Sequence, residues 1–112
     1  MRPVSVGNNL TAGSKTTVYT VPTGYYALWN LCYISNHTGS NKSVSVWWYD
    51  SSTSTEVTII DAYNLDAKKF LQFGGGGSYV VLEEGDQVRI TPESTSQMSS
   101  TNTFELYGAQ RT

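Results

Sequence analysis

The stretch that decides the fold is SVSVWWY, from Ser43 to Tyr49. Apolar side chains recur at every second position, and successive side chains of a β-strand point to opposite faces of the sheet. We therefore expect one face of this strand to enter a hydrophobic core and the other to point outward. The inward set is Val44, Val46 and Trp48, and the outward set is Ser43, Ser45, Trp47 and Tyr49.

Seven further segments have the same alternation and are separated by residues typical of turns. They are Thr16–Val21, Tyr25–Asn36, Glu56–Asp61, Lys68–Phe73, Tyr79–Leu82, Gln87–Thr91 and Thr103–Tyr107. The intervening turns include a hairpin tip at Gly74–Gly77 and a polar loop over Pro92–Asn102. About eight short strands predict an all-β fold, a single-domain antiparallel β-sandwich with a jelly-roll-like arrangement.

The 112 residues divide into two parts by composition. Residues 1–14 are rich in Gly and Asn with few apolar positions, which predicts an extended N-terminal arm, and residues 15–112 form the sandwich. One interpretation is a frayed terminus. The other is that Val4 and Val6 add an edge strand to a neighbouring subunit, with the arm ordered there and not on its own core. The expected contact residues of the arm are Arg2, Pro3, Val4 and Val6.

Charge and hydropathy exclude several classes of protein. Charged residues are only 14% of the chain, the formal net charge is -2, and the Lys and Arg residues are scattered, so a nucleic-acid partner is not expected. The longest apolar stretch is too short for a membrane span. The N-terminus has no apolar signal-peptide core, which predicts synthesis in a cytoplasm.

The chain also offers little material for catalysis or metal binding. It has one His and one Cys, and we expect Cys32 to be a buried apolar side chain. Gly74–Gly77 is followed by a strand and not by the Lys and helix of a phosphate-binding loop. Glu83–Asp86 is typical of a solvated turn, and Asp61 and Asp66 are too irregularly spaced for a calcium loop. We therefore expect no enzymatic activity, no catalytic residues, no cofactor and no metal.

Three aromatic side chains are expected on outward faces, namely Trp47, Tyr49 and Tyr107. Large amphipathic aromatics are enriched at protein interfaces, so these residues are candidate contacts with another subunit. The alternative is that a loop or the N-terminal arm covers them.

Three segments resemble small virion proteins of bacteriophages: Thr17–Tyr26, Ile34–Gly39 and Leu82–Ile90. With its length and bare sandwich, the chain is similar to the capsid decoration proteins, also called cement or staple proteins, of short-tailed phages of the epsilon-fifteen type. The resemblance implies a non-enzymatic protein made in the host bacterial cytoplasm and located in the virion, on the outer capsid surface. It further implies a homodimer or other homo-oligomer that clamps neighbouring major capsid proteins.

A second function stays open. Eight Tyr and three Trp residues on a β-sandwich also suit a carbohydrate- or receptor-binding domain of a phage tail or fibre, because sugar rings stack on flat aromatic faces. The absence of a signal peptide places this alternative second.

Overall fold

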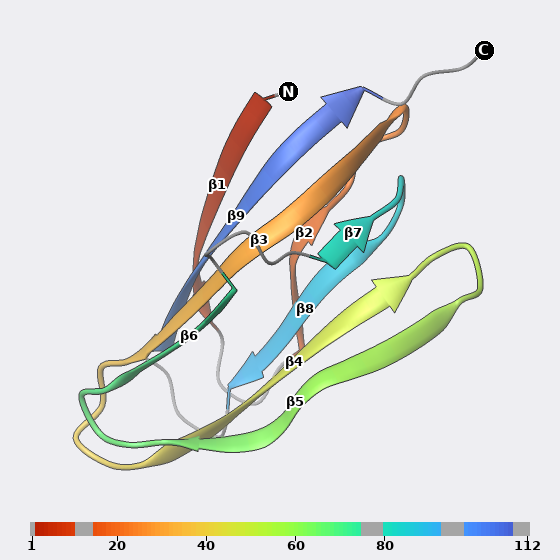
Figure 1. Ribbon diagram of the computed structural model, residues 1–112. Helices are drawn as coiled ribbons and strands as arrows, with labels where there is room; N and C mark the ends of the chain where they lie inside the picture. The colour runs from red at the N-terminus through yellow and green to blue at the C-terminus, as the bar shows by residue number, and fades with distance from the viewer. Residues whose placement is uncertain (1, 11–14, 75–79, 93–97, 109–112) are drawn as a thin grey trace.

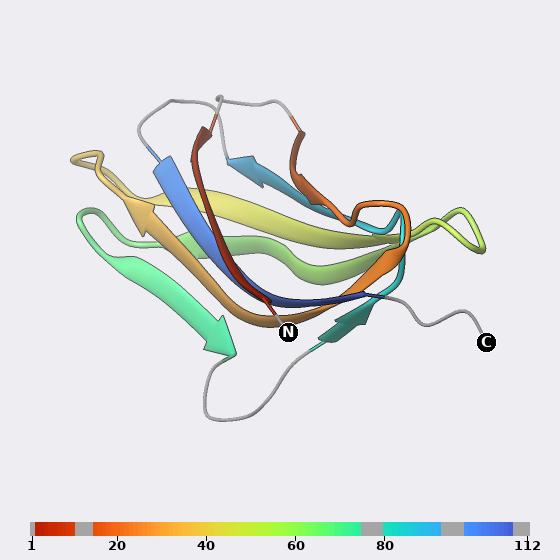
Figure 2. The same cartoon turned by 90° about the horizontal axis from the view of Figure 1, so that it is seen from above.

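The computed structural model describes residues 2–10, 15–74, 80–92 and 98–108 as two β-sheets packed face to face (Figures 1 and 2). Every regular element in these ranges is a strand. The strands are β1 (Arg2–Leu10), β2 (Thr16–Thr20), β3 (Tyr25–Asn36), β4 (Lys42–Asp50), β5 (Thr55–Leu65), β6 (Phe70–Gly74), β7 (Val80–Leu82), β8 (Gln87–Pro92) and β9 (Met98–Gly108).

The strand order confirms the predicted antiparallel sandwich and its jelly-roll arrangement. Sheet A has the order β1-β9-β3-β6, with β7 also pairing with β3, and sheet B has the order β2-β8-β4-β5. The chain is one long hairpin in which β1 pairs with β9, β2 with β8, β3 with β6 and β7, and β4 with β5. Pairing of β9 with β3 and of β8 with β4 rolls this hairpin into two layers, which is how a jelly roll is built.

The core lies between the sheets on the faces that alternation predicts. Val44 and Val46 on β4 are buried, and so are the inward residues of β8 and β9, Val88, Ile90, Phe104 and Leu106. Trp48 points inward as predicted and packs against this core, but it is only half-buried. Cys32 is fully buried, which confirms its expected role as an apolar side chain.

The expectation for the N-terminal arm is wrong over Arg2–Leu10. These residues form β1, an edge strand of sheet A that pairs with β9 of the same chain, from Arg2 opposite Leu106 to Leu10 opposite Met98. Val4 and Val6 pack against their own core instead of against another subunit. Strand propensity is low here because of Gly and Asn, but burial of the alternating apolar side chains outweighs it. Pro3 is tolerated because β1 is at an edge.

Two other strands extend well beyond the bounds predicted from the sequence. The polar run Met98–Asn102 was expected to be loop but is the first half of β9, where Ser100 and Asn102 point into the core. The β5 strand continues past Asp61 to Leu65 through an irregularity at Ala62, whose φ is 50°. Of the predicted hairpin tip, Gly74 ends β6 and Gly75–Gly77 lie outside the described residues.

Candidate functional site

The outer face of sheet B holds two of the predicted contact residues beneath cationic side chains of the same chain. The Lys15 ammonium lies 4.1 Å from the centroid of the Trp47 ring, and the Arg89 guanidinium carbon lies 4.1 Å from the centroid of the Tyr49 ring. Both distances are within the range of cation–π attraction. Trp47 and Tyr49 are half-buried. The cover over Trp47 comes from the connection between β1 and β2, which holds Lys15, and the cover over Tyr49 comes from Arg89 on the neighbouring strand β8.

Both cations are held in place by Glu56 on β5. Lys15 Nζ is 2.8 Å from Glu56 Oε1, and Arg89 Nη1 is 3.0 Å from Glu56 Oε2. The hydrogen bond from Lys15, followed by that from Arg89, lowers the pKa of the Glu56 carboxyl against an opposing effect of burial. The ion pairs cross β4 above its aromatic rings, so the Trp47 and Tyr49 rings lie beneath a network of charged side chains.

The outer face of sheet A is more apolar, and sequence reasoning identified only Tyr107 on it. Tyr107 stacks on Tyr26 with ring centroids 5.2 Å apart, and Tyr33 stacks on Phe70 at 5.0 Å. Phe70 is 57% exposed, Val81 48% and Tyr26 37%. We define the β3 stripe as the outward apolar residues along β3 and its neighbours: Tyr26, Leu28, Leu31, Tyr33, Phe70, Val81 and Tyr107.

The β3 stripe could not be recognised from sequence alternation, for a physical reason. The register of β3 against β9 shifts between Trp29 and Leu31, so a strict period of two cannot hold along the whole of Tyr25–Asn36. Leu31 is opposite Thr103, and neither is buried, whereas the next pair, Cys32 and Asn102, is fully buried. Alternation within Tyr25–Trp29 alone could have placed Tyr26 outward.

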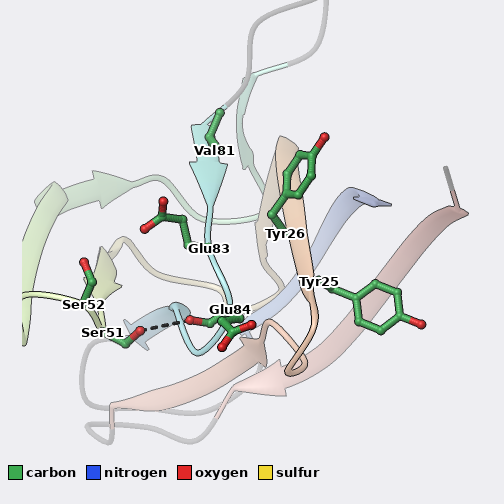
Figure 3. Close-up of a pocket in the computed structure, with 7 residues that line it drawn as sticks. All are labelled: Tyr25, Tyr26, Ser51, Ser52, Val81, Glu83 and Glu84. Atoms are coloured by element: carbon green, nitrogen blue, oxygen red, sulfur yellow. Dashed lines mark hydrogen bonds between the residues drawn. The ribbon is translucent and has the colours of Figure 1, made fainter. Parts of the chain in front are cut away.

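A pocket of about 570 Å³ lies at the end of the sandwich where β3 begins (Figure 3). It combines two phenol rings, two carboxylates and two hydroxyl groups. Its lining residues are Tyr25, Tyr26, Ser51, Ser52, Val81, Glu83 and Glu84. Tyr26 and Val81 extend in the same direction, whereas Tyr25 points away from Tyr26 (Figure 3). We call this the acidic end of the molecule.

The buried Asp86 carboxylate fixes the loops around this pocket. Its Oδ1 accepts hydrogen bonds from the amide of Ser51 at 3.0 Å and from the Ser51 hydroxyl at 3.1 Å. Its Oδ2 accepts from the amide of Glu83 at 2.9 Å and from Trp48 Nε1 at 3.3 Å. One side chain thus ties the β7–β8 turn to the β4–β5 turn and to β4.

A buried Asn36 has the same role at the opposite end. Its Nδ2 donates to the carbonyl oxygens of Ser40 and Leu65 at 3.0 and 2.9 Å, and its Oδ1 accepts from the Thr38 amide and hydroxyl at 2.9 and 2.6 Å. A smaller hollow of about 280 Å³ lies beside it. Its lining residues are Tyr33, Ser35, Asn36, His37, Lys68, Lys69 and Phe70. We call this the basic end.

The described residues offer few groups for chemistry. Within them, no three His, Cys, Asp or Glu side chains come together as a metal site would require. His37 Nε2 lies 3.1 Å from the Ser35 hydroxyl, a contact between neighbouring surface side chains. Burial raises the pKa of the Cys32 thiol to about 12, so the thiolate that a nucleophilic cysteine needs is not formed at neutral pH.

The four remaining predicted contact residues lie on the edge strand β1. The Arg2 guanidinium carbon is 5.9 Å from the centroid of the Tyr25 ring, Pro3 is exposed, and Val4 and Val6 face the core. The structure therefore separates the predicted contacts among three places: the β1 edge, the outer face of sheet B and, for Tyr107, the outer face of sheet A.

Comparison with known proteins assigns no family. No protein-family model matches the chain, and no curated protein matches it. In the part of the chain that the structure describes, no helix is long and apolar enough to cross a membrane.

Proposed function

We propose that this chain is a non-enzymatic virion structural protein that binds the outer surface of a phage capsid and clamps neighbouring major capsid proteins. One observation carries the proposal. The segments that resemble phage decoration proteins contain the residues that organise the two ends of this jelly roll, Asn36 in Ile34–Gly39 and Asp86 in Leu82–Ile90. The resemblance thus involves the framework of the fold, and not only exposed turn residues.

The capsid contacts are proposed on two surfaces. The outer edge of β1 has unpaired backbone groups along Arg2–Leu10, and such an edge can add a strand from a partner protein. The outer face of sheet B presents Trp47 and Tyr49 under Lys15 and Arg89. This combination of aromatic and Arg side chains is enriched at interfaces.

The test is binding to capsid shells that lack the protein. Purified full-length chain is added to such shells and pelleted with them, and we expect saturable co-sedimentation and a higher melting temperature of the shell. Trp47→Ala is expected to weaken this binding by about tenfold or more, as loss of an interface anchor does. The matched variant Tyr63→Ala, on the edge strand β5, is expected to bind as wild type. Absence of the chain from purified particles, or no co-sedimentation, contradicts the proposal.

The pocket at the acidic end favours a second candidate function, the binding of a carbohydrate by a tail or fibre domain. An exposed phenol ring at Tyr26, carboxylate acceptors at Glu83 and Glu84, and the Ser52 hydroxyl match the mixed apolar and polar chemistry of a sugar. A glycan array tests this candidate. Binding of a defined glycan that is lost in both Tyr26→Ala and Glu83→Gln would support it over the capsid role.

A further inference from the structure

The outer face of sheet A has the properties of a protein interface, and its apolar residues are continuous. The β3 stripe extends from Tyr26 and Val81 at the acidic end to Tyr33 and Phe70 at the basic end. It follows β3, which has β7 beside one part of its length and β6 beside another (Figure 1). The only charged side chain that the pairing places on the same outward side within it is Glu105, opposite Leu28. In contrast to sheet B, no ion-pair network among the described residues crosses these rings.

The two ends of the stripe carry opposite charge. Glu83 and Glu84 line the hollow next to Tyr26, and Lys68 and Lys69 line the hollow next to Phe70. Glu105 pairs with Leu28 and so belongs to the acidic half. A surface with one acidic and one basic end is complementary to a copy of itself turned by 180°, and such a two-fold contact is the commonest form of association between identical chains.

The size of the surface also fits a second copy. Twelve residues of β3 span roughly 40 Å, and three strands side by side span about 15 Å, which gives about 600 Å² before side-chain relief. A standard interface buries about 800 Å² on each partner. Two copies would bury about 1,200 Å² in total, which is the lower end of the range for specific interfaces, so we expect a weak dimer.

We infer that two copies of this chain associate through the outer faces of their A sheets, related by a two-fold axis near Leu31, so that the acidic end of each meets the basic end of the other. We choose a second copy as the partner for two reasons. The charge pattern of the stripe is complementary to itself after a rotation by 180°, and its area is close to what a dimer interface needs. This dimer would be the homo-oligomer that the proposed function includes, and we expect it to form in the free protein, without any capsid.

The experiment is sedimentation equilibrium on the full chain at low salt, and we expect a dimer at about 100 µM protein. Phe70→Ser and Val81→Ser are expected to raise the dimer dissociation constant by about tenfold or more. Val57→Ser and Tyr63→Ser are the matched controls, because these side chains on β5 are similarly exposed at 36% and 48% but lie in sheet B. The controls should leave the dissociation constant unchanged, with folding of each variant checked by circular dichroism.

Charge reversal tests the proposed orientation. Lys69→Glu leaves the pair Lys68 and Lys69 without net charge, and Glu83→Lys does the same to the pair Glu83 and Glu84. Each variant also places a like charge opposite its own copy, so each alone should dimerise about tenfold more weakly. Mixed in equal amounts, the two variants should form a heterodimer of wild-type affinity. A wild-type monomer at this concentration, a dimer insensitive to Phe70→Ser and Val81→Ser, or variants not rescued by mixing would overturn the inference. Failure of capsid binding would leave these measurements unaffected, so the two proposals fail separately.

Discussion

Asp86 is a buried carboxylate whose two oxygens each accept two hydrogen bonds. We predict that Asp86→Asn lowers the free energy of unfolding by about 2 to 3 kcal/mol. The amide that replaces one oxygen brings its own hydrogens, and either orientation of the new side chain points them at backbone N–H donors, of Ser51 or of Glu83. Urea denaturation with a linear fit measures the change.

The control for this prediction is Glu83→Gln in the same turn. Its side chain is exposed, so we expect its free energy of unfolding to lie within about 0.5 kcal/mol of wild type. If Asp86→Asn is as stable as this control, the carboxylate does not organise the acidic end as described.

Glu56 makes the stability of the protein dependent on pH. The pKa of its carboxyl is lower in the folded protein than the ordinary value of 4.5, so the ion pairs contribute fully above that pH and are lost as pH falls through the folded pKa. Because Glu56 and its partners are partly exposed, we expect a contribution of about 1 kcal/mol or less. Unfolding followed from pH 6 to pH 2 should show a shallower loss for Glu56→Gln than for wild type. In about 1 M salt this difference should shrink, and a difference that grows with salt would contradict the ion-pair explanation.

At the scale of an element, β4 separates two neighbouring tryptophans by face. We predict that Trp48→Ala lowers the free energy of unfolding by about 3 kcal/mol, because a large side chain packed on the core is removed and Asp86 loses a donor. Trp47→Ala should lower it by only about 1 kcal/mol, the size of a lost cation–π contact with Lys15. Equilibrium urea curves of both variants compare the two values. A larger loss for Trp47→Ala would mean that the two faces of β4 have been exchanged.

The elements that the sequence predicts well are those in which apolar residues carry the alternation. The bounds of β3 agree with the prediction at both ends, and β4 differs by one residue at each end. The first half of β9 was missed because Ser and Asn occupy its inward positions, where Asn102 accepts a hydrogen bond from Trp29 Nε1 at 3.1 Å. Such a position is recognisable only when the opposite strand is known.

The candidate surfaces could also be predicted only in part. Trp47 and Tyr49 were placed correctly on the outward side, but their cationic covers come from Lys15 and Arg89, on other segments of the chain. The β3 stripe was missed because it is assembled from β3, β6, β7 and β9, which only the topology brings together. Surfaces made by one strand could be predicted from the sequence, whereas surfaces made by several strands could not.

At the scale of the whole molecule, the two outer faces of the sandwich differ in how much aromatic surface they leave uncovered. On the outer face of sheet B, Lys15 and Arg89 cover the rings of Trp47 and Tyr49 and pair with Glu56, while sheet A leaves an aromatic stripe between two charged ends. The difference explains why self-association is assigned to sheet A. It also leaves the outer face of sheet B and the β1 edge for a different partner.

The rolled hairpin predicts an order of folding. The β4–β5 pair is local, joined by the short turn between Asp50 and Thr55, whereas β1 pairs with β9 across almost the whole chain. Closing a longer loop costs more chain entropy, so the nucleus should contain β4 and β5, and β1 should dock late. We predict that Val46→Ala, in β4, mainly slows folding, and that Val6→Ala, in β1, mainly speeds unfolding. Stopped-flow folding and unfolding rates measured over a range of urea concentrations distinguish the two effects. If Val6→Ala slows folding as much as Val46→Ala does, the edge strand is already docked in the transition state, and the hairpin does not form from its tip.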